Sequence, residues 1–109
     1  MKNNPKAIVK FNNILAGILE KTQTGYKFTY DDEFIKNSLG ISLSLPINQK
    51  TYTSEKMFPF FKGLIPEGWY LDIVSKKLKI DKSDSFKILL STCKDTIGAV
   101  SIEEMIVHE

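Results

Sequence analysis

The hydrophobic pattern of this chain changes its period half-way along the sequence, and this change constrains the fold more than any other feature. In the first half, apolar and polar residues alternate at 26–30 and again at 41–45, as expected of strands with one buried face. Two further apolar runs, 7–11 and 14–19, are separated only by Asn12-Asn13. This pair favours a tight hairpin because asparagine tolerates a positive φ angle. The first half therefore predicts three or four antiparallel strands.

The second half has the spacing of helices, in which apolar residues recur every three or four positions. A short helix is predicted over 57–65, and a second from Glu67 to about Lys79. Asp81 is the predicted N-cap of a third helix, with Asp84 in a capping-box-like position. A last strand is expected at 98–102. The predicted apolar stripe of the second helix is Tyr70, Leu71, Val74 and Leu78, and that of the third is Phe86, Leu89, Leu90 and Cys93.

Strands followed by helices and a closing strand indicate an α+β fold. We expect a small antiparallel sheet, made of N-terminal hairpins plus a C-terminal strand, with about three helices packed on one face. A domain has about 100–200 residues, so the 109 residues of this chain indicate a single domain over 1–109.

The composition excludes membrane and disulfide-rich classes. No window approaches about 18 uncharged apolar residues, so no transmembrane helix is expected. The N-terminus lacks the apolar segment of a signal peptide. A single cysteine cannot form an internal disulfide and fits a reducing compartment. The sequence therefore predicts a cytoplasmic protein with no membrane partner.

The charge is nearly balanced, with 15 basic and 13 acidic residues. Every basic residue is a lysine, and arginine supplies the bidentate fork that recognises guanine. We therefore expect no direct sequence-specific contact with nucleic acid. The densest basic patch could contact phosphates, but lysines near a helix C-terminus also complement the helix dipole. This patch consists of Lys76, Lys77, Lys79, Lys82 and Lys87.

Reactive side chains are few. His108 is the only histidine and is expected to be solvated, whereas Cys93 is expected to be a small buried hydrophobe. The acids Asp31, Asp32 and Glu33 could hold magnesium or serve in acid–base catalysis, but three adjacent acids between strands are typical of a solvated turn. Phosphate-binding glycine loops, zinc-ligand spacings and serine-hydrolase motifs are absent from the sequence. The sequence predicts no catalytic residue, metal or cofactor, and a protein that is not an enzyme.

Trp69, the only tryptophan, lies off the predicted apolar stripe of its helix. At about 100° per residue it lies about 130° from the centre of the stripe, with Ile73 at the edge. An exposed tryptophan beside Pro66 and Gly68 would be a candidate interface hot spot. The alternative is that Trp69 packs under the loop around Phe60 or against the sheet. Periodicity does not decide between these two positions.

Two segments resemble the N-terminal subdomain of HipA-type kinases. The pattern of that family is approximately S-L-S-L-P followed by P-F-F-x-x-L-L-P-E-G. This chain has SLSLP at 42–46 and PFFKGLIPEG at 59–68. The segments 9–17 and 97–101 also fit, so the similarity extends over about 6–103. The second motif is the specific one, because the strands alone would fit many folds.

The resemblance implies a function as well as a family. The kinase parts of HipA proteins, which are the phosphate loop, the catalytic aspartate and the metal-binding aspartate, have no counterpart in these residues. A free-standing copy of the subdomain resembles the HipS antitoxins of three-component HipBST toxin–antitoxin systems. The resemblance thus implies a non-enzymatic antitoxin that neutralises a HipT-like Ser/Thr kinase toxin, with a HipB-like DNA-binding protein in the same complex.

In this interpretation Trp69 would be an anchor inserted into the kinase, near or within its active cleft. The expected partner-binding residues are Trp69, Gly68, Glu67, Pro66, Phe60 and Ile73. Two alternatives stay open at this point. The chain could be a structural or dimerisation subdomain separated from a longer HipA-like kinase, or a small nucleic-acid-binding module that uses the lysine patch.

Overall fold

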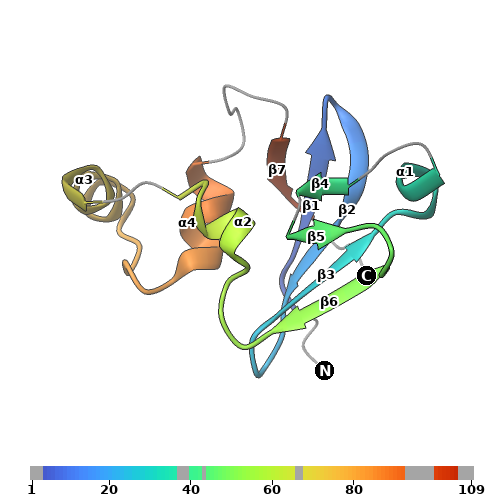
Figure 1. The fold of residues 1–109 in the computed structure, drawn as a ribbon. Coiled ribbons are helices and arrows are strands. Elements are labelled where there is room, and N and C mark those ends of the chain that lie inside the picture. The colour runs from blue at the N-terminus through green and yellow to red at the C-terminus, as the bar shows by residue number, and fades with distance from the viewer. Residues whose placement is uncertain (1–3, 37–39, 43, 66–67, 93–99, 106–109) are drawn as a thin grey trace.

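A computed structural model describes residues 4–36, 40–42, 44–65, 68–92 and 100–105 of the chain. Its main element is an antiparallel sheet of five strands in the order β6-β3-β2-β1-β7 (Figure 1). The last strand returns to pair with the first, so that Val9 faces Ile102. The five strands are β1 (Lys6–Phe11), β2 (Ile14–Lys21), β3 (Tyr26–Tyr30), β6 (Thr51–Ser54) and β7 (Val100–Glu104).

The hairpin between β1 and β2 forms at the predicted asparagine pair. Asn12 and Asn13 have φ angles of 53° and 65°, as in the two-residue turns that match the twist of adjacent strands. On β2, a Cβ atom at Gly17 would lie 2.4 Å from the carbonyl oxygen of Thr29 on β3. Only glycine therefore allows β2 and β3 to approach this closely.

The segment 41–45, expected as one strand, forms parts of two short strands instead. β4 (Gly40–Ser42) and β5 (Leu45–Pro46) pair with each other in a separate two-stranded sheet. The Ser42 hydroxyl accepts a hydrogen bond from the N–H of Ser44 at 3.1 Å. Such local hydrogen bonds compete with the strand ladder and favour a turn. The prediction of a continuous strand is therefore wrong.

The described residues form four helices, which are α1 (Asp32–Lys36), α2 (Pro59–Lys62), α3 (Gly68–Leu78) and α4 (Ser85–Thr92). The ring of Phe61 on α2 lies 5.5 Å from that of Phe28, and Phe34 on α1 stacks on Tyr30 at 5.8 Å. Phe28 and Tyr30 are two residues apart on β3, so α1 and α2 cover the same sheet face. Helix α4 lies beside α2 on that side (Figure 1). The α+β prediction, with helices on one face of an antiparallel sheet, is confirmed.

The core lies between this face and the helices. Burying each of its large side chains contributes about 1.5–3 kcal/mol to stability. The small sheet is held to the core by the Tyr30 hydroxyl, which donates a hydrogen bond to the Leu45 carbonyl and accepts one from the Ile41 N–H at 3.1 Å. The largest fully buried side chains are Tyr30, Phe28, Phe61, Leu19, Ile88, Leu89, Ile102 and Val9.

Three local predictions need correction. Strand β6 was not expected, because its segment Thr51–Ser54 is short and pairs with the distant β3. Residues 31–33 were expected to form only a turn, but Asp32 and Glu33 open α1, where their charges complement the helix N-terminus. Asp81 does not cap α4, because its carboxylate accepts hydrogen bonds from Ser83.

The cap of α4 is Asp84 instead. Its carboxylate accepts the N–H of Lys87 at 3.1 Å, as an N-cap side chain does. The last strand begins at Val100, and residues 98–99 of the expected strand lie outside the described residues. Cys93 and His108 also lie outside them, so the predictions made for these two side chains stay predictions.

Candidate interaction surface on helix α3

Helix α3 is the element furthest from the main sheet, beyond α2 and α4 (Figure 1). None of its eleven residues, all of which the structure describes, is buried, whereas α4 buries Phe86, Ile88 and Leu89. The side chain of Trp69 is 74% exposed, and Tyr70 and Ile73 are exposed as well. Large apolar side chains gathered on one exposed helix are typical of a surface that binds another protein.

The geometry of α3 explains which side is exposed. At about 100° per residue, Ile73 lies about 40° from Trp69, and Leu71 lies on the opposite side. Leu71 is partly buried and packs against the core, so the helix rests on this side. Trp69 is therefore exposed, as its position off the predicted stripe allowed, and it does not pack under the sheet.

The predicted apolar stripe of α3 is only partly buried. Leu71 and Val74 are half-buried, but Tyr70 is 54% exposed and Leu78 is 48% exposed. Tyr70 instead contacts Trp69, with ring centroids 6.0 Å apart in an edge-to-face arrangement. Tyr70 is thus a surface residue that the sequence pattern assigned to the core.

The C-terminal end of α3 is fixed by contacts with the following loop. The N–H of Ile80 donates to the Ser75 carbonyl at 3.0 Å, and the Ser75 hydroxyl donates to the Ile80 carbonyl. Lys82 forms an ion pair with Asp72. Its hydrogen bond and positive charge hold the pKa of Asp72 below the ordinary value. The helix is therefore held at one end while its Trp69 end is exposed.

The predicted partner-binding residues do not all lie together. Gly68, Trp69 and Ile73 share the exposed part of α3, where Gly68 has a φ angle of 60° and opens the helix. Phe60 is half-buried and packs edge-to-face on Phe61 at 5.2 Å, so it belongs to the border of the core. Pro66 and Glu67 lie outside the described residues.

Two further kinds of feature were sought in the part of the chain that the structure describes. No group of three or more His, Cys, Asp or Glu side chains there could hold a metal ion. No described helix has both the length and the apolar character needed to cross a bilayer.

The sheet, its covering helices and the largely exposed helix α3 define a small α+β domain that presents apolar side chains to its surroundings. The chain belongs to the HipA N-terminal domain family, whose model matches residues 7–103. The HipA N-terminal domain is a non-catalytic subdomain. The resemblance seen in the SLSLP and PFFKGLIPEG motifs is thereby confirmed.

Two similar proteins illustrate this membership. The chain is similar to the solved N-terminal domain of HipA toxin, with 26% identity, a TM-score of 0.78 and coverage of 99% of each chain. It is also similar to a protein of Haemophilus influenzae described only as uncharacterized, with 36% identity over 88 residues, or 81% of each chain. Both similarities extend over most of the fold described above.

Proposed function

We propose that this protein is an antitoxin that binds a HipA-like Ser/Thr kinase toxin and neutralises it. The observation that carries the proposal is the 74% exposure of Trp69 on a helix that buries none of its own residues. Membership of the HipA N-terminal domain family supports a HipA-like kinase as the partner.

The physical properties of α3 favour a tight contact. Tryptophan and tyrosine supply large contact areas for little loss of side-chain freedom, and Trp69 and Tyr70 already contact each other. By the 100° advance, Lys76 lies about 20° from Trp69 on the same side of the helix. We propose that the kinase offers an apolar pocket for Trp69 with an acidic border for Lys76.

The wider assembly follows from the same proposal. A HipB-like DNA-binding protein would join through the kinase complex in the cytoplasm. In this assembly the HipB-like protein would recognise the DNA. This division agrees with the complete absence of arginine from this chain, because arginine is the residue that most often contacts guanine.

The test compares Trp69→Ala with Leu78→Ala in binding to a HipA-family kinase that lacks its own copy of this domain. Leu78 is also exposed, but it lies about 180° from Trp69 around the helix. Loss of an anchor costs about 2 kcal/mol or more, or roughly thirtyfold in affinity. We therefore expect Trp69→Ala to bind the kinase roughly thirtyfold more weakly or worse. Cells that carry this variant should no longer be protected from the kinase.

Circular dichroism would establish that both variants are folded. The anchor role is wrong if folded Trp69→Ala binds and protects as well as the wild type does. Dimers of the isolated chain that Trp69→Ala abolishes, without any binding to the kinase, would instead support a dimerisation subdomain. DNA binding with a steep dependence on salt would support the nucleic-acid alternative.

A further inference from the structure

The β1–β2 hairpin and α1 lie at the other end of the molecule from α3 (Figure 1). A second apolar surface lies between them. It is an open groove of about 500 Å³. We call it the hairpin groove. Its apolar walls are Phe11, Ile14, Leu15 and Phe34, and its border carries Asp31 and Glu33.

The aromatic walls of the hairpin groove pack on the core, whereas its aliphatic walls are exposed. Phe34 stacks on the buried Tyr30 at 5.8 Å, and the ring of Phe11 meets Phe34 edge-to-face at 6.2 Å. In contrast, Ile14 is 62% exposed and Leu15 is 39% exposed. Phe11 and Phe34 are therefore held in place by the core. Ile14 and Leu15, beside the turn, are exposed to water, and burying them against another apolar group would be favourable.

The border of the groove is acidic, and its two carboxylates differ in their ionic partners. Lys50 pairs with Asp32 at 2.6 Å and Lys36 pairs with Glu33 at 3.4 Å. Among the described residues, no ion pair includes Asp31. Its carboxylate accepts one hydrogen bond, from the N–H of Glu33 at 3.2 Å.

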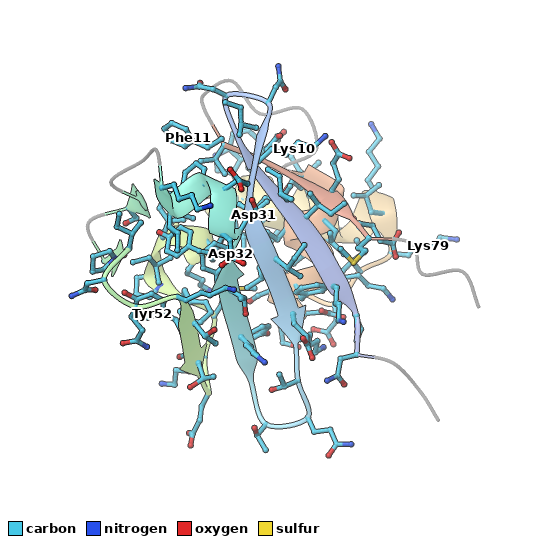
Figure 2. All side chains as sticks on the ribbon, turned by 90° about the vertical axis from the view of Figure 1, so that its right-hand side faces the viewer. Lys10, Phe11, Asp31, Asp32, Tyr52 and Lys79 are labelled. Atoms are coloured by element: carbon cyan, nitrogen blue, oxygen red, sulfur yellow. The ribbon has the colours of Figure 1, made fainter. Side chains whose placement is uncertain are left out.

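The position of Asp31 is fixed by its backbone. Its N–H donates to the Ala16 carbonyl at 2.8 Å, and its own carbonyl accepts the Ile35 N–H at 3.2 Å. Figure 2 shows Phe11 on the α1 side of the hairpin and Lys10 on the side of β7, where Lys10 pairs with Glu103 at 3.0 Å. Lys10 therefore does not neutralise the groove.

We propose that the hairpin groove binds a short segment of a partner protein in which a large apolar side chain lies one or two residues from an arginine or lysine. The apolar side chain enters between Ile14 and Phe34, and the cation reaches Asp31, a charge-assisted contact stronger than one between neutral groups. Nucleic acid and anionic lipid are disfavoured because both would meet the carboxylates at the border. The groove lies away from α3, so both surfaces can be occupied at once.

The test uses two capped tetrapeptides as probes, Arg-Leu-Phe-Arg and Glu-Leu-Phe-Glu, titrated into the full chain and followed by amide NMR spectra. Salt of about 0.01 M leaves electrostatic attraction largely unscreened, and about 1 M removes most of it. We expect the cationic peptide to shift the amides of Phe11–Leu15 and Asp31–Phe34. It should bind about tenfold more tightly than the acidic peptide, and this preference should fade at high salt.

Two variants separate the charge from the apolar wall. Asp31→Asn keeps an oxygen acceptor for the N–H of Glu33 and removes only the charge, so it should weaken the cationic peptide about tenfold and abolish the preference between peptides. Ile14→Thr keeps a β-branched residue at an exposed strand position and should weaken both peptides. Leu78→Ala, on α3, should change neither affinity.

Three results would overturn the proposal. One is equal affinity for the two peptides, and another is a set of shifted amides on α3 in place of the hairpin. The third is concentration-dependent self-association that Asp31→Asn abolishes, which would assign the groove to a second copy of this chain. If Asp31→Asn does not fold, the Ile14→Thr variant and the peptide comparison decide the matter.

Discussion

Replacing Tyr30 with phenylalanine removes a buried hydroxyl that ties the small sheet to the core. The Tyr30 hydroxyl bonds both the Leu45 carbonyl and the Ile41 N–H, and its ring packs on Phe28 at 4.8 Å and on Phe34 at 5.8 Å. Phenylalanine keeps these ring contacts and leaves no large cavity. The loss therefore comes from two backbone groups deprived of their partner.

Each buried group left without a partner costs about 1–3 kcal/mol, so Tyr30→Phe should lower the free energy of unfolding by roughly 3 kcal/mol. Domains of this size have a total stability of roughly 5–15 kcal/mol. At about 4 °C per kcal/mol, the melting temperature should fall by about 12 °C. Urea unfolding followed by circular dichroism measures the free energy directly.

The matched control is Tyr52→Phe. The Tyr52 hydroxyl donates to the Pro46 carbonyl at 2.5 Å, but this hydrogen bond is exposed, so water can replace it. We expect this control to lose less than about 1 kcal/mol. If Tyr30→Phe loses no more than Tyr52→Phe, the small sheet is not held by the Tyr30 hydroxyl and the reasoning is refuted.

The same hydroxyl gives a pH dependence. Burial raises the pKa of Tyr30 above its ordinary value of 10.0, and the hydrogen bond from Ile41 offsets part of that rise. The unfolded chain therefore loses this proton first as the pH rises. The stability contributed by neutral Tyr30 is fully present below pH 10 and is lost as the pH rises through the folded pKa. In Tyr30→Phe, the decline of stability above pH 10 should be smaller, as urea midpoints across that range would measure.

Three other predictions concern single positions. Gly17→Ala should lose about 1–3 kcal/mol because its Cβ would collide with Thr29, whereas Gly63→Ala, whose nearest contacts lie at 3.5 Å, should change the urea-derived stability by less than about 1 kcal/mol. The backbone N–H of Ser83, and then its hydroxyl, donate hydrogen bonds that lower the pKa of Asp81 from its ordinary value of 3.8. The stability of the fold should therefore fall as the pH drops below 3.8, and Asp81→Asn should reduce this decline in urea unfolding. Trp69 fluorescence should be quenched by iodide in the free protein and protected when the kinase binds.

The strands that the sequence predicted well are those specified by adjacent residues. The hairpin at Asn12 and Asn13 needs only two residues that accept a positive φ angle, and the alternation of β3 is visible within five residues. Strand β6 was missed because its pairing partner lies far away in the sequence. The segment 41–45 was misjudged because a local serine hydrogen bond, which alternation does not reveal, breaks the ladder.

The candidate surface on α3 was predictable only in part, because periodicity is a local property of the sequence whereas burial depends on how the helix packs. Periodicity placed Trp69 away from the apolar stripe of its helix, and the exposure of Trp69 agrees. It also assigned Tyr70 and Leu78 to the core, and both are exposed. A stripe shows which side of a helix is apolar, but its burial depends on whether another element covers that side. On α3, Leu71 packs against the core, whereas Leu78, about 20° from it around the helix, lies at the C-terminal end of the helix and is 48% exposed.

The pairing of β7 with β1 also determines when the sheet can be completed during synthesis. β1 begins at Lys6 and β7 ends at Glu104, so their ladder cannot form until nearly all of these residues have left the ribosome. Until then β1 is an open edge, with N–H and C=O groups ready to pair with another strand. Closing this ladder brings together residues far apart in sequence, a step that slows folding. The nascent chain therefore carries this unpaired edge of β1 until β7 emerges.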